Sequence, residues 1–124
     1  MYCETITRTV EVDFTHKKQI GDGGEFARVR LRLEPLPSGA GLQFANELPD
    51  NNLIRAEWIR GIQEGIQQAS KTGVVAGHPV VDLRVTLLSG TYHDSDSNWR
   101  TFSLAAQGAF WDGMRKAGAK ILLR

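Results

Sequence analysis

Apolar and polar residues alternate in three stretches of the chain, and this period of two predicts β-strands. The stretches are residues 5–14, 26–33 and 81–87, and each presents its apolar side chains on one face. A short apolar segment at residues 42–46 follows a turn rich in proline and glycine. It predicts a strand that returns beside residues 26–33 as a hairpin. A last strand is predicted at residues 119–124. The polar face of the third stretch carries Asp82, Arg84 and Thr86.

Two other stretches repeat apolar residues at intervals of three and four, which predicts amphipathic α-helices. The first helix is predicted over residues 55–71 and the second over residues 98–117. Their apolar stripes are Ile59, Ile62, Ile66 and Ala69 in the first helix, and Phe102, Ala105, Ala106, Ala109, Phe110 and Gly113 in the second. The resulting order, strand-strand-strand-helix-strand-helix-strand, predicts a two-layer α+β sandwich. Because each strand has only one apolar face, both helices are expected to cover the same face of the sheet.

Composition narrows the class of protein. The chain has 124 residues, the length of one domain, and a net charge of +1, so a nucleic-acid or membrane partner would have to be recognised by local charge. The single cysteine, Cys3, excludes an internal disulfide and favours a cytoplasmic setting. No apolar run approaches the ~20 residues of a membrane span, so no membrane partner is predicted. Strand-like segments lie close to both ends, and we expect residues 1–124 to be a single domain of a longer multidomain protein.

The segment GTYHDSDSNW, residues 90–99, gathers a histidine, two aspartates and two serines. His93, Asp94 and Asp96 have the chemistry of a metal site or an acid–base site. A hard cation needs about six oxygen ligands and zinc needs three or four ligands, and the sequence nearby offers too few. The segment therefore favours helix capping, in which Asp96 or Ser97 accepts a backbone N–H at the start of the second helix.

A glycine-rich segment, THKKQIGDGGEF, holds the only consecutive basic residues, Lys17 and Lys18, beside His16. It is predicted to be a loop between two strands, which is not the strand-to-helix setting of a phosphate-binding loop. Two interpretations remain open: a solvated connection, or a flexible basic loop that meets a nucleic-acid backbone.

Three arginines, Arg28, Arg30 and Arg32, share the polar face of the strand predicted at residues 26–33. One interpretation is a solvated sheet face in which Glu11 and Asp82 are their partners. The other is a basic stripe, about 13 Å long at ~3.3 Å per residue, that contacts RNA phosphates.

Five segments, which together cover nearly the whole chain, match one pattern. They are YCETI, HKKQIGDGGEFARV, LEPLPSGAGLQFAN, IQEGIQQASKTGVVAGHPVVDLRVTLLSGTYHDSDS and FSLAAQGAFWDGMRKAGAKILL. In this order and with matching gaps they resemble domain IV of the translation elongation factor G family. The resemblance implies a fold like domain 2 of ribosomal protein S5, with a four-stranded mixed sheet, two helices on one face and a left-handed crossover. The general rule for such crossovers is the right hand.

The resemblance also implies what the domain does. Residues 16–25 and 91–97 would lie together at the tip of an elongated domain, which enters the ribosomal decoding region, contacts rRNA and the tRNA–mRNA duplex, and supports translocation. The RNA-contacting residues it implies are His16, Lys17, Lys18, Gln19, Gly21, Gly24, Tyr92, His93, Asp94, Asp96 and Ser97. It implies no catalytic residue, metal or cofactor in this chain. The parent protein would be a monomeric, cytoplasmic, ribosome-dependent GTPase that binds GTP and magnesium through a domain outside these residues.

The chain departs from the family pattern at several positions. They are Ile20, Asp22, Gly23, Glu25, Phe26 and Ala27 in the first tip segment, and Trp99 after the second. These departures weaken the positive charge of the tip and favour, as an alternative, a divergent paralogue that acts in ribosome recycling or ribosome protection. Two other classes of function stay open. One is a small metal-dependent or acid–base enzyme that uses His93, Asp94 and Asp96, and the other is a protein-binding module that uses the sheet face.

Overall fold

The two stretches with helical periodicity form the two helices of the molecule. In the computed structural model, which describes all of residues 1–124, α1 spans Ala56–Ser70 and α2 spans Trp99–Lys116. Both helices begin and end within one residue of the predicted bounds. Their apolar stripes are enclosed, and Ile62, Phe102 and Phe110 are completely buried. The 3.6-residue period therefore predicted both the helices and the side that they bury.

Six strands form two sheets. Their bounds are β1 (Tyr2–Thr5), β2 (Val10–Ile20), β3 (Gly23–Pro35), β4 (Leu42–Asn46), β5 (Leu83–Thr91) and β6 (Lys120–Leu123). The larger sheet has the order β2-β3-β5-β4, with β2, β3 and β5 antiparallel and β4 parallel to β5. β1 and β6 pair with each other in a separate two-stranded sheet. The predicted four-stranded mixed sheet is confirmed.

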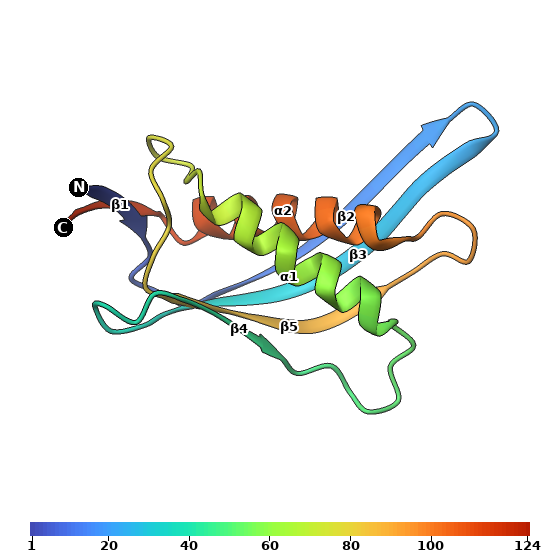
Figure 1. Cartoon of the computed structure of the whole chain (residues 1–124), viewed down its shortest axis with the longest axis horizontal. Coiled ribbons are helices and arrows are strands. Elements are labelled where there is room, and N and C mark those ends of the chain that lie inside the picture. The colour runs from blue at the N-terminus through green and yellow to red at the C-terminus, as the bar shows by residue number, and fades with distance from the viewer.

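Both helices cover one face of the larger sheet, as predicted (Figure 1). Figure 1 shows the helices in front of the sheet, with β4 and β5 both running to the right and β5 above β4. This arrangement makes the β4–α1–β5 crossover left-handed, against the usual rule for parallel strands. The apolar faces of β2, β3 and β5 meet the helices in a single core of 22 buried residues.

The single strand predicted at residues 5–14 is wrong. β1 ends at Thr5 and β2 begins at Val10, so residues 6–9 carry the chain from the small sheet to the large one. Ile6 is 2% exposed and belongs to the core although it lies outside both strands. Its place in the alternation therefore reflects burial and not a continuous hydrogen-bonded ladder.

The loop predicted at residues 16–25 is also wrong. β2 continues to Ile20, which pairs with Gly23, so only Gly21 and Asp22 form the turn. Gly21 has a φ of 56°, and a positive φ at the first central residue alone is the pattern of the type II′ hairpin turn. Figure 1 shows this β2–β3 hairpin projecting beyond the helices.

The predicted hairpin between residues 26–33 and 42–46 is wrong as well, because β5 lies between β3 and β4. Asp82 does not lie on a strand either. It precedes β5 with a φ of 61°, is 3% exposed, and accepts hydrogen bonds from Gly39 N–H at 3.1 Å and Gly41 N–H at 3.0 Å. Thr86, expected on the polar face, is fully buried.

The two ends of the chain lie side by side at the end of the molecule opposite the projecting hairpin (Figure 1). The amino group of Met1 donates to the Arg124 carbonyl oxygen at 2.6 Å. Neither helix combines the length and the apolar content that crossing a membrane requires.

Candidate functional site

Two segments that are distant in sequence lie at the end of the molecule away from the termini (Figure 1). They are the end of the β2–β3 hairpin, residues 16–25, and the connection between β5 and α2, residues 91–97; we call them together the tip. The Ser97 hydroxyl donates to the Phe26 carbonyl oxygen at 2.7 Å and accepts from His93 N–H at 2.8 Å. Phe26 N–H donates to the Asp96 carbonyl oxygen at 2.9 Å. These bonds hold the second segment against Phe26 of β3, and Gly24 of the hairpin lies beside Asp96.

The hairpin supplies the free cations of the tip. Lys17 and Lys18 are exposed, and neither forms an ion pair. Because consecutive strand residues point to opposite faces, the two ammonium groups leave the hairpin on opposite sides. Gly24 lies where the segments approach, and a Cβ there would lie 3.0 Å from Asp96 Oδ2 and 3.2 Å from the Lys18 carbonyl oxygen. Glycine therefore lets the hairpin and the second segment come this close.

His93 is the most accessible ring of the tip, with 63% of its side chain exposed. Its ring centroid lies 6.1 Å from that of Phe26, with the planes tilted by 57°. Nδ1 lies 3.8 Å from Asp96 Oδ2, which is longer than a hydrogen bond. The imidazole is thus supported on one side by an aromatic ring and is otherwise free to contact another molecule.

The remaining singled-out residues of the second segment differ in their surroundings. The Tyr92 ring lies 5.4 Å from the Trp58 ring, which is buried, so Tyr92 supports the segment from the core side. Asp94 is exposed and forms no ion pair. Gln19, on the hairpin, donates from Nε2 to the Gly21 carbonyl oxygen at 3.4 Å.

The predicted capping of α2 by Asp96 or Ser97 is wrong. Asn98 is the N-cap: its side-chain oxygen accepts from Thr101 N–H at 2.9 Å, and Asn98 N–H donates to the Thr101 hydroxyl at 3.0 Å. This reciprocal pair is a capping box with threonine in place of the usual glutamate or glutamine. Asp96 and Ser97 instead shape the connection that precedes the cap.

A charged cluster that the sequence did not reveal ties the hairpin to α2. His16 Nε2 lies 3.1 Å from Glu25 Oε1, and Arg100, in the first turn of α2, forms an ion pair with Glu25 Oε2. The hydrogen bond from His16 and the charge of Arg100 hold the pKa of the Glu25 carboxyl below its ordinary value, although desolvation acts in the opposite direction. Glu25 and Arg100 are 75 residues apart, so no local pattern could have paired them.

Removing this cluster is expected to loosen the hairpin without unfolding the protein. In Glu25→Ala, amide hydrogen exchange of residues 17–24 should rise at least several-fold, because local opening requires only the local contacts to break. The melting temperature should change little. In the unmodified protein the same loosening should set in as pH falls below the ~4.3 of an unfolded glutamate, since the folded state keeps Glu25 ionised to lower pH than the unfolded state does. Glu64→Ala, at an exposed position of α1, is the matched control; equal exchange in both variants would contradict the role of the cluster.

The three arginines of β3 lie on one sheet face as expected, and each has a carboxylate partner. Arg28 pairs with Asp13, Arg30 with Glu11, and Arg32 with Glu47, the last at 3.0 Å. Asp82, which was also expected to pair with these arginines, does not, because its carboxylate pairs with Arg124. Across this face the four arginines at positions 28, 30, 32 and 84 meet the four acids at positions 11, 13, 34 and 47. The arginines of this face are therefore paired with carboxylates, whereas Lys17 and Lys18 at the tip are not.

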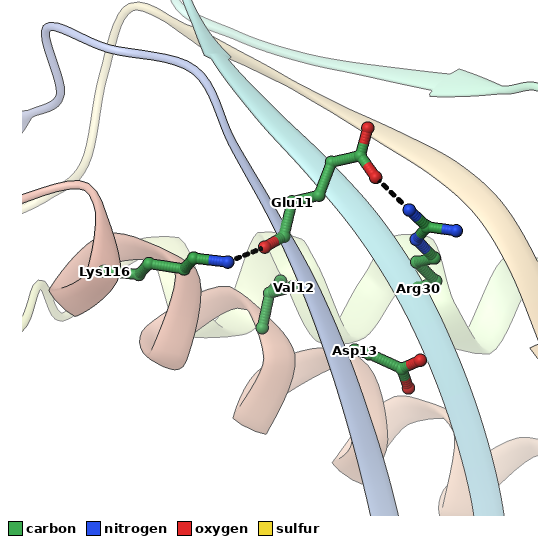
Figure 2. Close-up of a pocket in the computed structure, with 5 residues that line it drawn as sticks. All are labelled: Glu11, Val12, Asp13, Arg30 and Lys116. Carbon is green, nitrogen blue, oxygen red and sulfur yellow. Dashed lines mark hydrogen bonds and ion pairs between the residues drawn. The ribbon is translucent and has the colours of Figure 1, made fainter.

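The largest depression in the surface lies away from the tip, along the outer edge of β2 (Figure 2). It measures about 440 Å³ and is lined by Glu11, Val12, Asp13, Arg30 and Lys116. Figure 2 shows that Lys116 Nζ reaches the Glu11 carbonyl oxygen, at 2.7 Å, and that Arg30 meets the Glu11 carboxylate. No group of three or more His, Cys, Asp or Glu side chains is arranged to hold a metal ion.

Comparisons with known proteins identify the family and agree with the fold. The family model for elongation factor G, domain IV, matches residues 1–118. Elongation factor G of Orientia tsutsugamushi (strain Ikeda) is 46% identical over 121 residues, which are 98% of this chain and 17% of that protein. Elongation factor G of Wolbachia pipientis gives the same identity and coverage. A crystal structure from Thermus thermophilus matches with a TM-score of 0.88 and 35% identity, over 97% of this chain and 18% of that one. The chain thus spans about a sixth of the length of the curated relatives it matches.

Proposed function

The chain belongs to the elongation factor G domain IV family, and from this membership we propose that it is the ribosome-contacting tip domain of a translation factor. In this role the tip enters the decoding region of the ribosome, contacts rRNA and the tRNA–mRNA duplex, and promotes translocation. The domain performs no chemistry of its own. The parent protein is a longer, cytoplasmic, monomeric GTPase, which binds GTP and magnesium through another domain.

The observation that carries this proposal is the construction of the tip. The second segment is held against Phe26, the residue after the hairpin segment, by one backbone hydrogen bond and one hydrogen bond from the Ser97 hydroxyl, at the end of the molecule farthest from the termini (Figure 1). Lys17 and Lys18 carry unpaired positive charge there, and His93 presents an accessible ring. Lysines contact phosphates and position a protein on RNA, while a ring stacks on bases or ribose. The rest of the molecule is a rigid layered support for these groups.

The residues proposed to contact RNA are those that project from the tip. His93, Lys17 and Lys18 are exposed and free of strong internal partners, and Gln19 and Asp94 are exposed beside them. Gly21 and Gly24 allow the tight turn and the close packing of the two segments. Four other residues support these groups from the side of the core, since each is half-buried: His16, Tyr92, Asp96 and Ser97. The arginine face is left out, because its charges are neutralised.

The test is His93→Ala in the full-length protein. We expect translocation to slow by about tenfold, because a stacking contact with nucleic acid contributes about 1–3 kcal/mol. Ribosome-dependent GTP hydrolysis should stay near its normal rate, since the altered ring is remote from any nucleotide. The measurement is single-round translocation beside GTP turnover on the same ribosomes.

His78→Gln is the control, because His78 stacks on Tyr2 at the opposite end of the domain and should leave both rates unchanged. Equal loss of translocation and GTP hydrolysis in His93→Ala would argue against a role of the tip. Normal translocation with impaired ribosome splitting would indicate the recycling paralogue. The departures from the family pattern at Ile20, Glu25 and Trp99 favour that alternative.

A further inference from the structure

β2 is an edge strand of the larger sheet, and its outer side has no strand partner. In the order β2-β3-β5-β4 it has only β3 beside it. Ile20 and Gly23 flank the two-residue turn, and in such a hairpin the flanking pair exchanges both of its backbone hydrogen bonds. The even-numbered residues of β2 therefore bond to β3. The odd-numbered residues from Glu11 to Gln19 turn their N–H and C=O groups outward.

Lys116 occupies one of these outward groups. From the last turn of α2, its Nζ donates to the Glu11 carbonyl oxygen at 2.7 Å, beside the depression of about 440 Å³ along this edge (Figure 2). None of the other outward residues uses its backbone N–H or C=O in a bond outside the sheet. An open row of such groups is a template for another strand, and a lysine on the edge is a common protection against such pairing.

The outward residues of β2 are complementary to themselves when the strand is reversed. They are all exposed, and in order they are Glu11, Asp13, Thr15, Lys17 and Gln19. When a second copy runs antiparallel with Thr15 opposite Thr15, Asp13 lies opposite Lys17 of that copy. Asp13 keeps 47% of its side chain exposed beside Arg28, so it has room for a second cation. Opposite charges and paired threonines across two strands are stabilising.

This register also matches the backbone. Because outward residues lie opposite outward residues, each opposed pair can exchange two hydrogen bonds, which gives about ten over the strand. At both ends of the row Glu11 meets Gln19 of the other copy. The Glu11 carbonyl oxygen can accept from that Gln19 N–H only after Lys116 has left it.

We propose that the outer edge of β2 is a self-association surface for a second copy of the chain, paired about Thr15, and that Lys116 keeps this surface closed. The inference goes beyond the proposed function and does not depend on it. Two-fold symmetry requires both copies of Lys116 to be released before the edges pair completely. The lysine thus keeps the chain monomeric and leaves the edge of the hairpin, including Lys17, uncovered.

Removing the ammonium group tests the role of Lys116. Lys116→Met keeps an unbranched side chain and loses the donor. A hydrogen bond from a charged donor contributes at least about a factor of ten to an equilibrium constant, so the dissociation constant of the dimer should fall about a hundredfold when both copies lack it. Sedimentation velocity of the 124-residue chain should show a dimer for Lys116→Met at a concentration at which the unmodified chain is a monomer.

Lys120→Met is the matched control, since it removes an exposed lysine of β6 and should leave the chain monomeric. A monomeric Lys116→Met, or a dimeric Lys120→Met, overturns the proposal. Two additions to Lys116→Met should restore the monomer. Thr15→Pro removes an outward N–H, which an edge strand tolerates, and Lys17→Glu places a like charge opposite Asp13. A dimer that survives both changes is formed through another surface, such as the exposed apolar side chains of β6, and also overturns the proposal.

A disulfide tests the register directly. Thr15→Cys, added to Lys116→Met, should give a covalent dimer on oxidation, because the Cα atoms of a hydrogen-bonded pair lie about 5.5 Å apart, within reach of a disulfide. Glu11→Cys in the same background is the control. The two copies of position 11 would lie about 26 Å apart at ~3.3 Å per residue, so no cross-link should form. Equal cross-linking at positions 11 and 15 contradicts pairing about Thr15.

Discussion

Replacing Glu4 by alanine is expected to lower the free energy of unfolding by about 4 kcal/mol. Glu4 lies in β1 and is completely buried. Oε1 accepts a hydrogen bond from Val75 N–H at 2.8 Å, and Oε2 accepts from Ala76 N–H at 2.8 Å and His78 N–H at 3.0 Å. Each bond to a charged acceptor contributes about 1.5–3 kcal/mol. Water reaches part of this connection in the variant, so the loss stays below the sum of the three.

Urea denaturation of the unmodified protein and of Glu4→Ala measures this loss. The free energy of unfolding of Glu4→Gln should lie between the values of these two proteins, because the amide keeps one acceptor oxygen and turns an NH₂ group toward backbone donors. Glu64→Ala is the control: it removes an exposed glutamate of α1 and should change the free energy of unfolding by less than about 0.5 kcal/mol. A loss below about 1 kcal/mol in Glu4→Ala would show that the connection between α1 and β5 holds its shape without the carboxylate.

The Glu4 carboxylate also makes the free energy of unfolding depend on pH. Burial raises the pKa of Glu4, but the N–H groups of Val75, Ala76 and His78, with the charge of His78, lower it by more, so the pKa lies below its ordinary value. An unfolded glutamate takes up its proton near pH ~4.3, at which the folded carboxyl is still ionised. The contribution of Glu4 is therefore fully present above that pH and is lost as pH falls through the folded pKa.

Sequence periodicity predicted the parts of the fold that depend on local spacing. The helices were correct because Ile62, Ile66, Phe102 and Phe110 repeat at helical intervals over long stretches. The pairing of β4 with β5 was missed, because nothing in residues 42–46 distinguishes a hairpin partner from a parallel partner 41 positions later. The hairpin at the tip reads as a loop in the sequence because glycine and lysine are common in loops. In a two-residue turn, however, glycine supplies the positive φ that keeps both strands paired.

For the candidate site as well, the sequence predicted the residues but not the bonds between them. Residues 16–18 and 91–97 stand out in the sequence because their residue types are unusual for strands, and the resemblance to a family placed them together. The bonds that fix the site were not visible. Ser97 and Phe26 are 71 residues apart, and Glu25 and Arg100 are 75 apart. A long-range polar contact leaves no periodic trace in a single sequence, so Glu25 stands out there only as a loss of positive charge.

Replacing Gly65 by alanine is expected to destabilise the protein by about 3 kcal/mol. Gly65 lies in α1 where it crosses α2, and an ideal Cβ at this position overlaps the backbone oxygen of Ser103 and lies 3.1 Å from its carbonyl carbon and Cα. Backbone atoms of a neighbouring helix cannot turn aside as a flexible side chain can. The helices would have to separate, which opens the core beneath them around Ile62 and Phe102.

The sign of this change separates packing from helix propensity. Alanine is the better helix former by about 1 kcal/mol, so propensity alone predicts that Gly65→Ala stabilises α1, whereas the contact with Ser103 predicts the opposite. Gly23→Ala is the control, because a Cβ at Gly23 makes only an ordinary van der Waals contact, 3.6 Å from the Ile20 carbonyl oxygen, and φ there is not positive. It should shift the free energy of unfolding by less than about 0.5 kcal/mol. Urea denaturation of both variants decides the matter. A more stable Gly65→Ala would mean that α1 and α2 are farther apart than the contact between Gly65 and Ser103 implies, and that the two helices behind the tip separate easily.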